Sequence, residues 1–320
     1  MPTQSKGQKS QLLRLWIDRV RRRVEEHADQ GVVLGHRWIF GPENAPTFDG
    51  SPRLALITVN FSTLRWLKLM LLTLSGQKAL GLLTDIVVVD NASRDGSLGF
   101  LRQLAARVPR IRLIENRYFL SHARGMRLGF KALRRSSSTS NVVLSIDTDV
   151  IFLRKDVLEA LAREFENGAA LAGEMRHGLY DVPEAQASFV AARRDVMARR
   201  DVLPWVNHGA PSYWMQKSIR KAGLPISDFR SNEGGYALHR GRAGVAAAKI
   251  FRPSGSYGSI PNDEPHFMGI PRGAEIWREV EDNWAKWLAP DTEGECIDYL
   301  ARRFAALHRL TTLHQTNPFT

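Results

Sequence analysis

The sequence predicts an α/β fold with a mostly parallel central sheet. Between residue 53 and about residue 166, short apolar runs alternate with stretches whose apolar residues recur at helical spacing, and this alternation is typical of parallel strands joined by helices. Each apolar run also ends in a polar residue. With 320 residues, 43% of them hydrophobic, the chain is long enough for one large domain with a sizeable core.

Residues 1–50 are predicted to form a helical appendage followed by a linker. A helical pattern extends from Ser10 to about His27, and it has an apolar stripe on one side and arginines on the other. The stripe consists of Leu12, Trp16, Val20 and Val24, and the arginines are Arg19, Arg21, Arg22 and Arg23. A basic amphipathic helix packs on its own domain more often than on a membrane. We therefore expect packing on the domain, with peripheral membrane contact as the alternative.

Four strands and three intervening helices follow from the periodicity. The predicted strands are 54–60, 85–90, 111–115 and 141–146, and the predicted helices are 63–75, 97–106 and 123–134. In open sheets of this kind, ligands bind beyond the carboxyl ends of the strands. The polar residues at those ends are Asn60, the pair Asp90 and Asn91, Asn116 and Asp147.

The rest of the chain is predicted with less detail. A helix is expected at about 212–222, and two more at about 274–287 and 293–310. The stretch 252–262 is rich in turn residues, so it is either a connector or a lid.

Asp147-Thr148-Asp149 follows the last of the four predicted strands and is a candidate metal site. Carboxylates at i and i+2 suit hard divalent ions such as Mg²⁺ or Mn²⁺, although the same pattern is common in acidic loops. Neither a G-x-G-x-x-G motif nor a Walker A loop follows the first strand. Nucleotide phosphates would therefore need another partner, and a metal ion can serve as one.

Composition narrows the class of protein. The net charge of +12 favours polyanionic ligands, namely nucleotide phosphates, anionic lipid, charged glycan or nucleic acid, but no zinc-finger or RNP signature indicates a nucleic-acid module. The single cysteine, Cys296, excludes an internal disulfide framework. The polar start and the lack of a long apolar stretch predict a cytoplasmic protein without a transmembrane segment.

Four motifs resemble those of family 2 glycosyltransferases of the GT-A fold. They are TVNF at 58–61, VVVDNASRDGS at 87–97, ARG at 123–125 and DTDV at 147–150. The resemblance covers about residues 53–170. It implies the GT-A nucleotide-diphospho-sugar transferase fold, a divalent metal, and transfer of a sugar from a nucleotide-diphosphate sugar, by family frequency a UDP-sugar, to an acceptor. We therefore divide residues 51–320, predicted to be a GT-A catalytic domain, into a donor half (51–150), an acceptor half (151–270) and C-terminal helices (271–320).

Site roles follow from the resemblance position by position. Nucleotide contacts are implied for Val59 and Phe61 around the base, for Asp90, Asn91, Arg94 and Arg124 near the base, ribose or diphosphate, and for Asp147. Asp149 would be the principal metal ligand, with Asp147 beside it and His239 as the third ligand. Arg240 and Arg242 are candidate diphosphate contacts, because guanidinium binds phosphate bidentately. Each of these residues also has a structural alternative, such as strand termination by Asp90 and Asn91.

The proton acceptor is where the sequence departs from the family. In much of the family an acidic pair opens a helix some way after the metal motif, but no such pair precedes the helix at 212–222. His208, Asp228 or Glu233 could replace it, or the enzyme could retain configuration and need no base. A non-catalytic, GT-A-like binding protein is the remaining alternative, whereas a sugar nucleotidyltransferase would need a glycine-rich basic loop after the first strand.

A polyanionic acceptor such as DNA, anionic lipid or charged glycan is a further hypothesis. It depends on the basic excess and on four arginines in the predicted acceptor half. These are Arg193, Arg194, Arg199 and Arg200.

Overall fold

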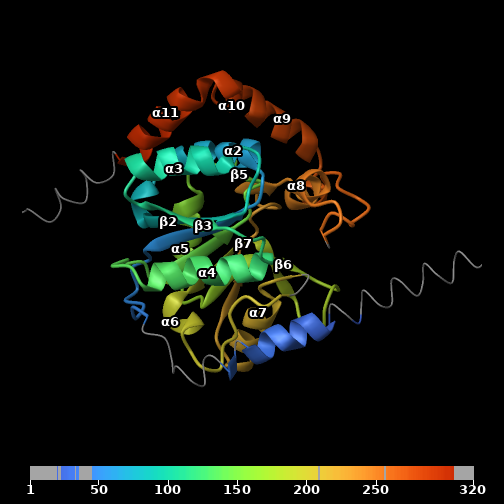
Figure 1. Cartoon of the computed structure of the whole chain (residues 1–320). Coiled ribbons are helices and arrows are strands. Elements are labelled where there is room, and N and C mark those ends of the chain that lie inside the picture. The colour runs from blue at the N-terminus through green and yellow to red at the C-terminus, as the bar shows by residue number, and fades with distance from the viewer. Residues whose placement is uncertain are drawn as a thin grey trace, which may run out of the picture.

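The centre of the molecule is a seven-stranded sheet in the order β3-β2-β1-β4-β7-β6-β8 (Figure 1). A computed structural model describes residues 20, 23–32, 34–35, 45–207, 210–255 and 257–305. The strands are β1 (Leu54–Asn60), β2 (Leu83–Asn91), β3 (Ile111–Asn116), β4 (Val142–Ile146), β6 (Leu171–Arg176), β7 (Glu184–Arg193) and β8 (Ile226–Asp228). Strand β7 is antiparallel to both of its neighbours, and the other pairs are parallel. The predicted mostly parallel α/β sheet is confirmed.

Helices cover both faces of this sheet. One face packs against α2 (Leu64–Ser75), α3 (Ser97–Arg107), α5 (Val157–Glu166) and α11 (Glu293–Ala305), and the other against α4 (His122–Arg134), α6 (Arg194–Met197) and α7 (Tyr213–Lys221). The remaining helices are α8 (Ala243–Phe251), α9 (Gly273–Asn283) and α10 (Ala285–Leu288). Each face therefore has its own apolar core, as expected for strands buried on both sides.

The sequence predicted most of these elements. The four predicted strands correspond to β1 to β4, and the helices at 63–75, 97–106, 123–134 and 212–222 correspond to α2, α3, α4 and α7. The helix expected at 274–287 is divided into α9 and α10 at Trp284, whose φ of −110° is not helical. Helix α11 begins as predicted and is described to Ala305. None of the described helices is both long enough and apolar enough to cross a membrane.

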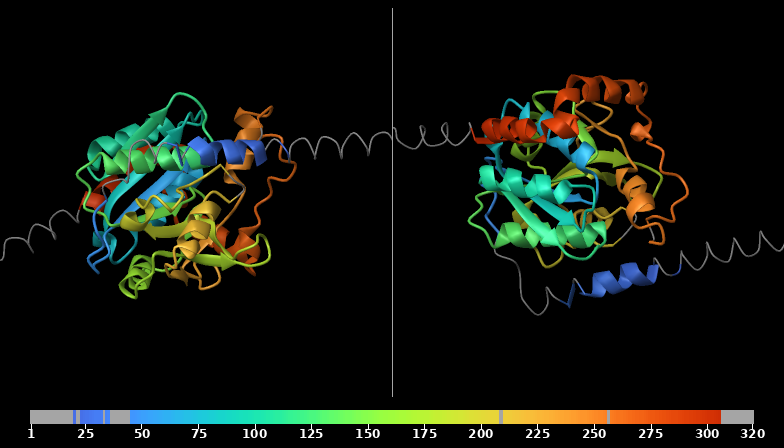
Figure 2. Two further views of the ribbon diagram at one scale, coloured as in Figure 1. Left: turned by 90° about the horizontal axis from the view of Figure 1, so that it is seen from below. Right: turned by 45° about the horizontal axis from the view of Figure 1, so that its top comes forward.

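The N-terminal helix, defined here as the helical residues 20, 23–32 and 34–35, lies on the side of the molecule opposite α9 to α11 (Figures 1 and 2). The earlier part of the predicted helix, residues 10–19, lies outside the described residues. Our expectation that its apolar stripe packs on the domain is wrong for the described part, because Val20 is 40% and Val24 62% exposed. The polar side of the helix makes the contacts with the domain instead.

Two glycines of α4 bring this helix close to β1. A Cβ atom at Gly129 would lie 2.6 Å from Ile57 Cγ2, and one at Gly125 would lie 2.9 Å from both methyl carbons of Val59. Since real carbon atoms pack at about 3.5–4.0 Å, neither position has room for a larger residue. Gly125 of the ARG motif is therefore explained by packing.

Candidate functional site

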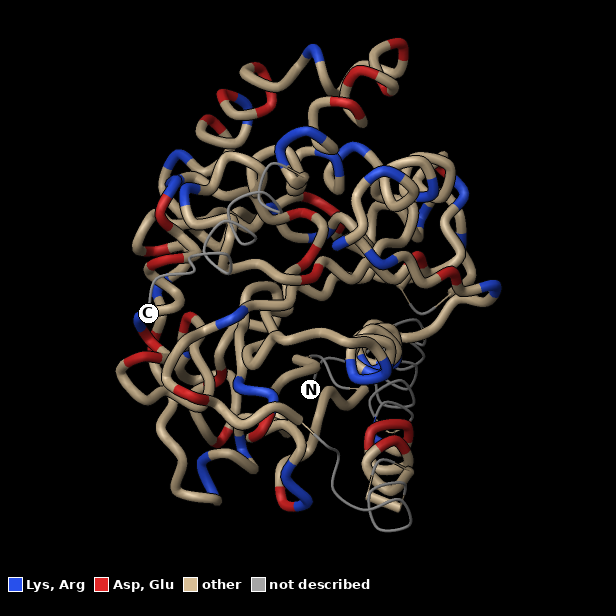
Figure 3. The backbone as a smooth tube through the Cα atoms, turned by 90° about the vertical axis from the view of Figure 1, so that its left-hand side faces the viewer, with Lys and Arg blue, Asp and Glu red and all other residues tan. Residues whose placement is uncertain are grey.

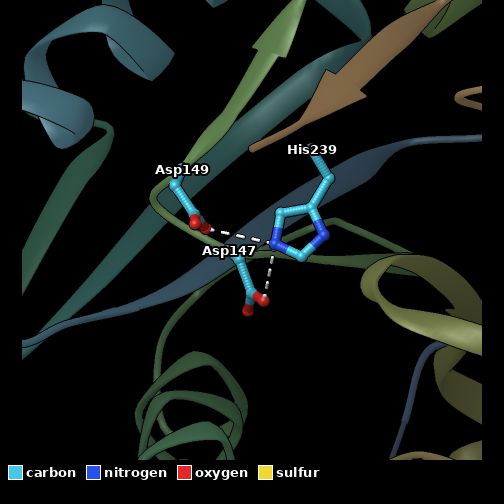
Figure 4. Close-up of side chains that lie close together, drawn as sticks. All are labelled: Asp147, Asp149 and His239. Atoms are coloured by element: carbon cyan, nitrogen blue, oxygen red, sulfur yellow. Dashed lines mark ion pairs between the residues drawn. The ribbon is translucent and has the colours of Figure 1, made fainter. Parts of the chain in front are cut away.

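The two carboxylates of Asp147-Thr148-Asp149 follow β4, at the edge where the parallel strands end. The next strand, β5 (Val150–Phe152), pairs with β9 (Ala237–His239), and the register places Val150 opposite His239. This pairing brings the imidazole to the carboxylates (Figure 4): His239 Nε2 is 3.3 Å from Asp149 Oδ1 and 3.7 Å from Asp147 Oδ2. One ligand atom from each of the three residues lies within 4.8 Å of the others.

The electrostatics of this cluster suit a divalent cation. Burial by itself raises the pKa of Asp149, but the charge of His239 and its hydrogen bond outweigh this effect and hold the pKa below its usual value. Burial likewise lowers the pKa of His239, while the Asp149 carboxylate raises it to above the usual value. Without metal, the pair therefore holds a proton between a carboxylate and an imidazole. A cation that binds here displaces that proton, and oxygen ligands with one imidazole suit Mn²⁺ and Mg²⁺.

Amide side chains orient the His239 ring from its other edge. Its Nδ1 lies 3.0 Å from the Gln186 amide nitrogen, and its backbone N–H donates to Asn232 Oδ1 at 2.9 Å. In this structure the Gln186 nitrogen faces Nδ1, and the Gln186 oxygen accepts from Asn232 Nδ2 at 3.2 Å. Metal binding through Nε2 requires the proton on Nδ1 and therefore the opposite orientation of the Gln186 amide.

The cluster opens onto a cavity of about 280 Å³. Seven predicted site residues line this cavity, namely Val59, Phe61, Asn91, Asp147, Asp149, His239 and Arg242. The cavity also contains the beginning of α8, residues 243–245, whose first backbone N–H donates to Asp149 Oδ2 at 3.2 Å. The structure therefore assembles the implied nucleotide and metal residues from four separate segments of the chain.

Four residues with implied nucleotide roles do not line the cavity. Asp90 is 1% exposed and accepts hydrogen bonds from the Asn60 amide and the Ser93 backbone, so in this structure it organises the strand end. The Arg240 guanidinium stacks on the Trp66 ring at 4.6 Å.

The other two residues are on the surface. The Arg94 side chain is exposed, and Arg124 is 3.7 Å from Asp29 of the N-terminal helix.

The structure places the predicted carboxylate bases outside the cavity. Asp228 ends β8, where it accepts from the Met175 backbone at 2.8 Å, and the Glu233 side chain is 63% exposed and 3.8 Å from Arg230. His208 lies outside the described residues. Among the described residues, Asp147 and Asp149 are the carboxylates that line the cavity.

Sequence reasoning missed several residues of the cavity wall. They include His122, Arg176, Gln186, Tyr257 and His266. His122 Nε2 is 3.7 Å from Asp147 Oδ1, and the His266 ring is 5.8 Å from that of His239. His122 directly precedes the ARG motif and could have been found there, whereas the others have no local signal in the sequence.

Arg193, one of the four arginines proposed to bind a polyanionic acceptor, is at the far end of the sheet from the site. Strand β7 is antiparallel to β4, so Arg193 pairs with Val142 at the start of β4, at the opposite end from Asp147. Arg193 and Arg199 form ion pairs with Asp195 and Asp201, and Arg194 is 3% exposed and donates to the Ser140 backbone. Over the described chain, basic and acidic residues are interspersed (Figure 3). Arg193, Arg194 and Arg199 therefore do not support the polyanion hypothesis.

Comparison with known proteins identifies the family. The model of glycosyl transferase family 2 matches residues 56–217, and the chain belongs to this family. The predicted GT-A fold, with the acidic motif at a strand end, agrees with this membership. No curated protein matches the chain.

Several solved structures resemble the chain at low identity. The mannosyltransferase PcManGT from Pyrobaculum calidifontis, in complex with GDP-Man and Mn²⁺, is 18% identical over 93% of this chain and 92% of that one, with a TM-score of 0.45. TarS 1-349 from S. aureus in complex with UDP is 11% identical, with coverages of 84% and 94% and a TM-score of 0.45. Glucosyl-3-phosphoglycerate synthase from Mycobacterium tuberculosis, with Mn²⁺, UDP and phosphoglyceric acid, is 13% identical, with coverages of 69% and 88% and a TM-score of 0.43.

Proposed function

We propose that this protein transfers a sugar from a nucleotide-diphosphate sugar, with a UDP-sugar as the first candidate, to an acceptor hydroxyl. The observation that carries the proposal is the convergence of Asp147, Asp149 and His239 at one cavity in a family 2 chain. These three residues would hold Mn²⁺ or Mg²⁺. The bound cation supplies Lewis-acid stabilisation of the negative charge that develops on the leaving diphosphate.

The surrounding residues suit a nucleotide diphosphate. Val59 and Phe61 line the cavity with apolar surface against which a nucleobase can pack. The exposed Arg242 precedes α8, so its guanidinium and the positive end of the helix face the same space. A helix N-terminus and an arginine together favour phosphate. The proposed donor therefore lies between β1 and α8, with its diphosphate at the metal ligands.

For the proton of the acceptor hydroxyl, imidazoles are the candidates that the cavity offers. Asp228 and Glu233 do not line it, and the described wall contains His122 and His266 in addition to His239. Burial lowers the pKa of His266, and the nearby His239 lowers it further, so His266 is neutral at neutral pH. Its Nδ1 accepts the Met268 backbone N–H at 3.1 Å, so His266 would have to release this hydrogen bond to accept a proton there. His208, next to the described Asn207, is the candidate that the sequence adds.

A thermal-shift panel tests the proposal. UDP, GDP, dTDP and CDP are each added to the purified chain with and without Mn²⁺. A ligand that binds only the folded state raises the melting temperature by mass action, so we expect a metal-dependent rise with one nucleotide, UDP first. If no nucleotide shifts the melting temperature in the presence of Mn²⁺, the donor site is refuted and the chain is a non-catalytic member of the family.

A further inference from the structure

The N-terminal helix is attached to the domain through its polar side. Asp29 is 3% exposed, and the Arg127 guanidinium donates to both of its carboxylate oxygens at 2.7 Å. The backbone N–H of Asn207 also donates to Asp29, at 2.8 Å. One turn earlier, Glu26 accepts from the Trp214 indole at 2.6 Å. A buried and fully paired carboxylate of this kind fixes which side of the helix faces inward.

The opposite side of the helix carries three exposed aliphatic side chains, with the exposed His27 and Gly31 between Val24 and Leu34 on the same side. With about 3.6 residues per turn, Val20, Val24 and Leu34 lie within roughly 40° of one line along the helix, on the side opposite Asp29. Their exposed fractions are 40%, 62% and 44%. An amphipathic helix of a water-soluble domain has the reverse arrangement, with its apolar side buried. A row of exposed aliphatic side chains on a helix with a fixed orientation indicates a surface that is covered by something else.

The sequence around this apolar row is strongly basic. Five arginines occur within ten residues, namely Arg14, Arg19, Arg21, Arg22 and Arg23, and the described Arg23 is exposed. The acids Glu26 and Asp29 are bound to the domain. Among the described residues, the outer side of this helix therefore combines aliphatic side chains with the exposed Arg23, and aliphatic side chains beside positive charge are typical of helices that lie in the interface of an anionic membrane.

We propose that the N-terminal helix docks this protein on an anionic lipid surface. Val20, Val24 and Leu34 enter the interface, and the exposed Arg23 contacts the lipid head groups. A second copy of the chain fits this surface less well. One exposed row on a single helix is small against the roughly 800 Å² per partner of a stable protein interface, and two copies would bring like charges together.

The N-terminal helix contacts two segments that lie next to the cavity wall in the sequence. Asp29 binds the backbone of Asn207, and Arg124 is 3.7 Å from Asp29. Asn207 and Arg124 are close along the chain to residues of the cavity wall. Asn207 precedes Ala210 and Pro211, and Arg124 follows His122. The helix is therefore joined to two segments that also contribute to the cavity wall, while α9 to α11 lie on the far side of the molecule (Figures 1 and 2).

Vesicle co-sedimentation of the full chain tests the proposal without any nucleotide, so its outcome is independent of the glycosyltransferase proposal. Vesicles of phosphatidylcholine alone are compared with vesicles that contain equal parts of phosphatidylcholine and phosphatidylglycerol. We expect binding to the anionic vesicles, weaker binding at high salt, and little binding to the neutral vesicles. Val24→Asp should weaken binding at least about tenfold, the factor expected from the lost burial of one valine side chain.

The matched control is Arg278→Gln, which changes the net charge by the same amount on α9, on the far side of the molecule. It should bind nearly as well as the wild type, and Val24→Leu should bind at least as well. Because Val24 is exposed, none of these changes should alter the melting temperature. Equal binding by Val24→Asp and Arg278→Gln, or no binding to anionic vesicles, overturns the proposal. Loss of a dimer in Val24→Asp also overturns it and assigns this side of the helix to a second copy.

Discussion

Replacing Asp149 by asparagine tests the metal centre with the smallest change in shape. The amide keeps the size of the side chain and an oxygen that accepts from the Ala243 backbone, but it removes the negative charge. With 3.3 Å between Asp149 Oδ1 and His239 Nε2, a pair of full charges attracts by about 5 kcal/mol at an effective dielectric constant of about 20. A divalent cation held by the same groups loses an attraction of at least that size.

The variant also no longer has to keep a buried carboxylate charged, and this gain in free energy offsets part of the lost attraction. We therefore expect Asp149→Asn to lower Mn²⁺ affinity about a hundredfold, which corresponds to about 2.8 kcal/mol. Asp147→Asn should have a smaller effect, because its side chain is 31% exposed and that of Asp149 only 5%. Titration of the purified chain with Mn²⁺, followed by electron paramagnetic resonance of the free ion, measures the difference.

The control is Asp228→Asn, an identical chemical change at an exposed carboxylate outside the cavity. It should leave Mn²⁺ affinity unchanged. An unaltered titration curve for Asp149→Asn refutes the assignment of the metal centre, and an equal loss in both variants shows that the effect is one of net charge.

Three further predictions concern the scaffold. Burial raises the pKa of Asp29, but its hydrogen-bonded arginine and the backbone hold it below the usual value. The contribution of Asp29 to the packing of the N-terminal helix on the domain is therefore fully present above the unfolded pKa of about 3.9 and is lost as the pH falls through the lower, folded value. Asp29→Asn should imitate this loss, and faster tryptic cleavage at neutral pH measures it. Gly125→Ala should cost about 1–3 kcal/mol by overpacking against Val59 and weaken the nucleotide thermal shift, whereas Gly99→Ala, with no atom within 4 Å, should do neither. Burial raises the pKa of Cys296 to about 11, so iodoacetamide should label it only after denaturation, and rapid labelling of the native chain would contradict its buried position.

The sequence by itself determined the elements whose signal is local. Strands β1 to β4 are apolar runs that end in polar residues, and the helices between them have their own periodicity, so both were predictable from short windows. The Asp147-Thr148-Asp149 motif was visible for the same reason, because its two carboxylates are two residues apart at the end of one strand. The family, too, was recognisable from four short motifs in order.

Only the tertiary structure decided which distant residues meet. The family resemblance implied His239 as a metal ligand, but its own residues do not show how it reaches Asp149: β5 pairs with β9 in a register that joins segments about ninety residues apart, and nothing in a local window specifies that pairing. The direction of β7 sends Arg193 to the wrong end of the sheet for a role at the cavity. The N-terminal helix shows the same limit, since its periodicity defines an apolar side and a polar side but not which of them faces the domain. A buried pair between Asp29 and Arg127 decides that, because the energy of a paired, desolvated charge depends on the partner that the fold supplies.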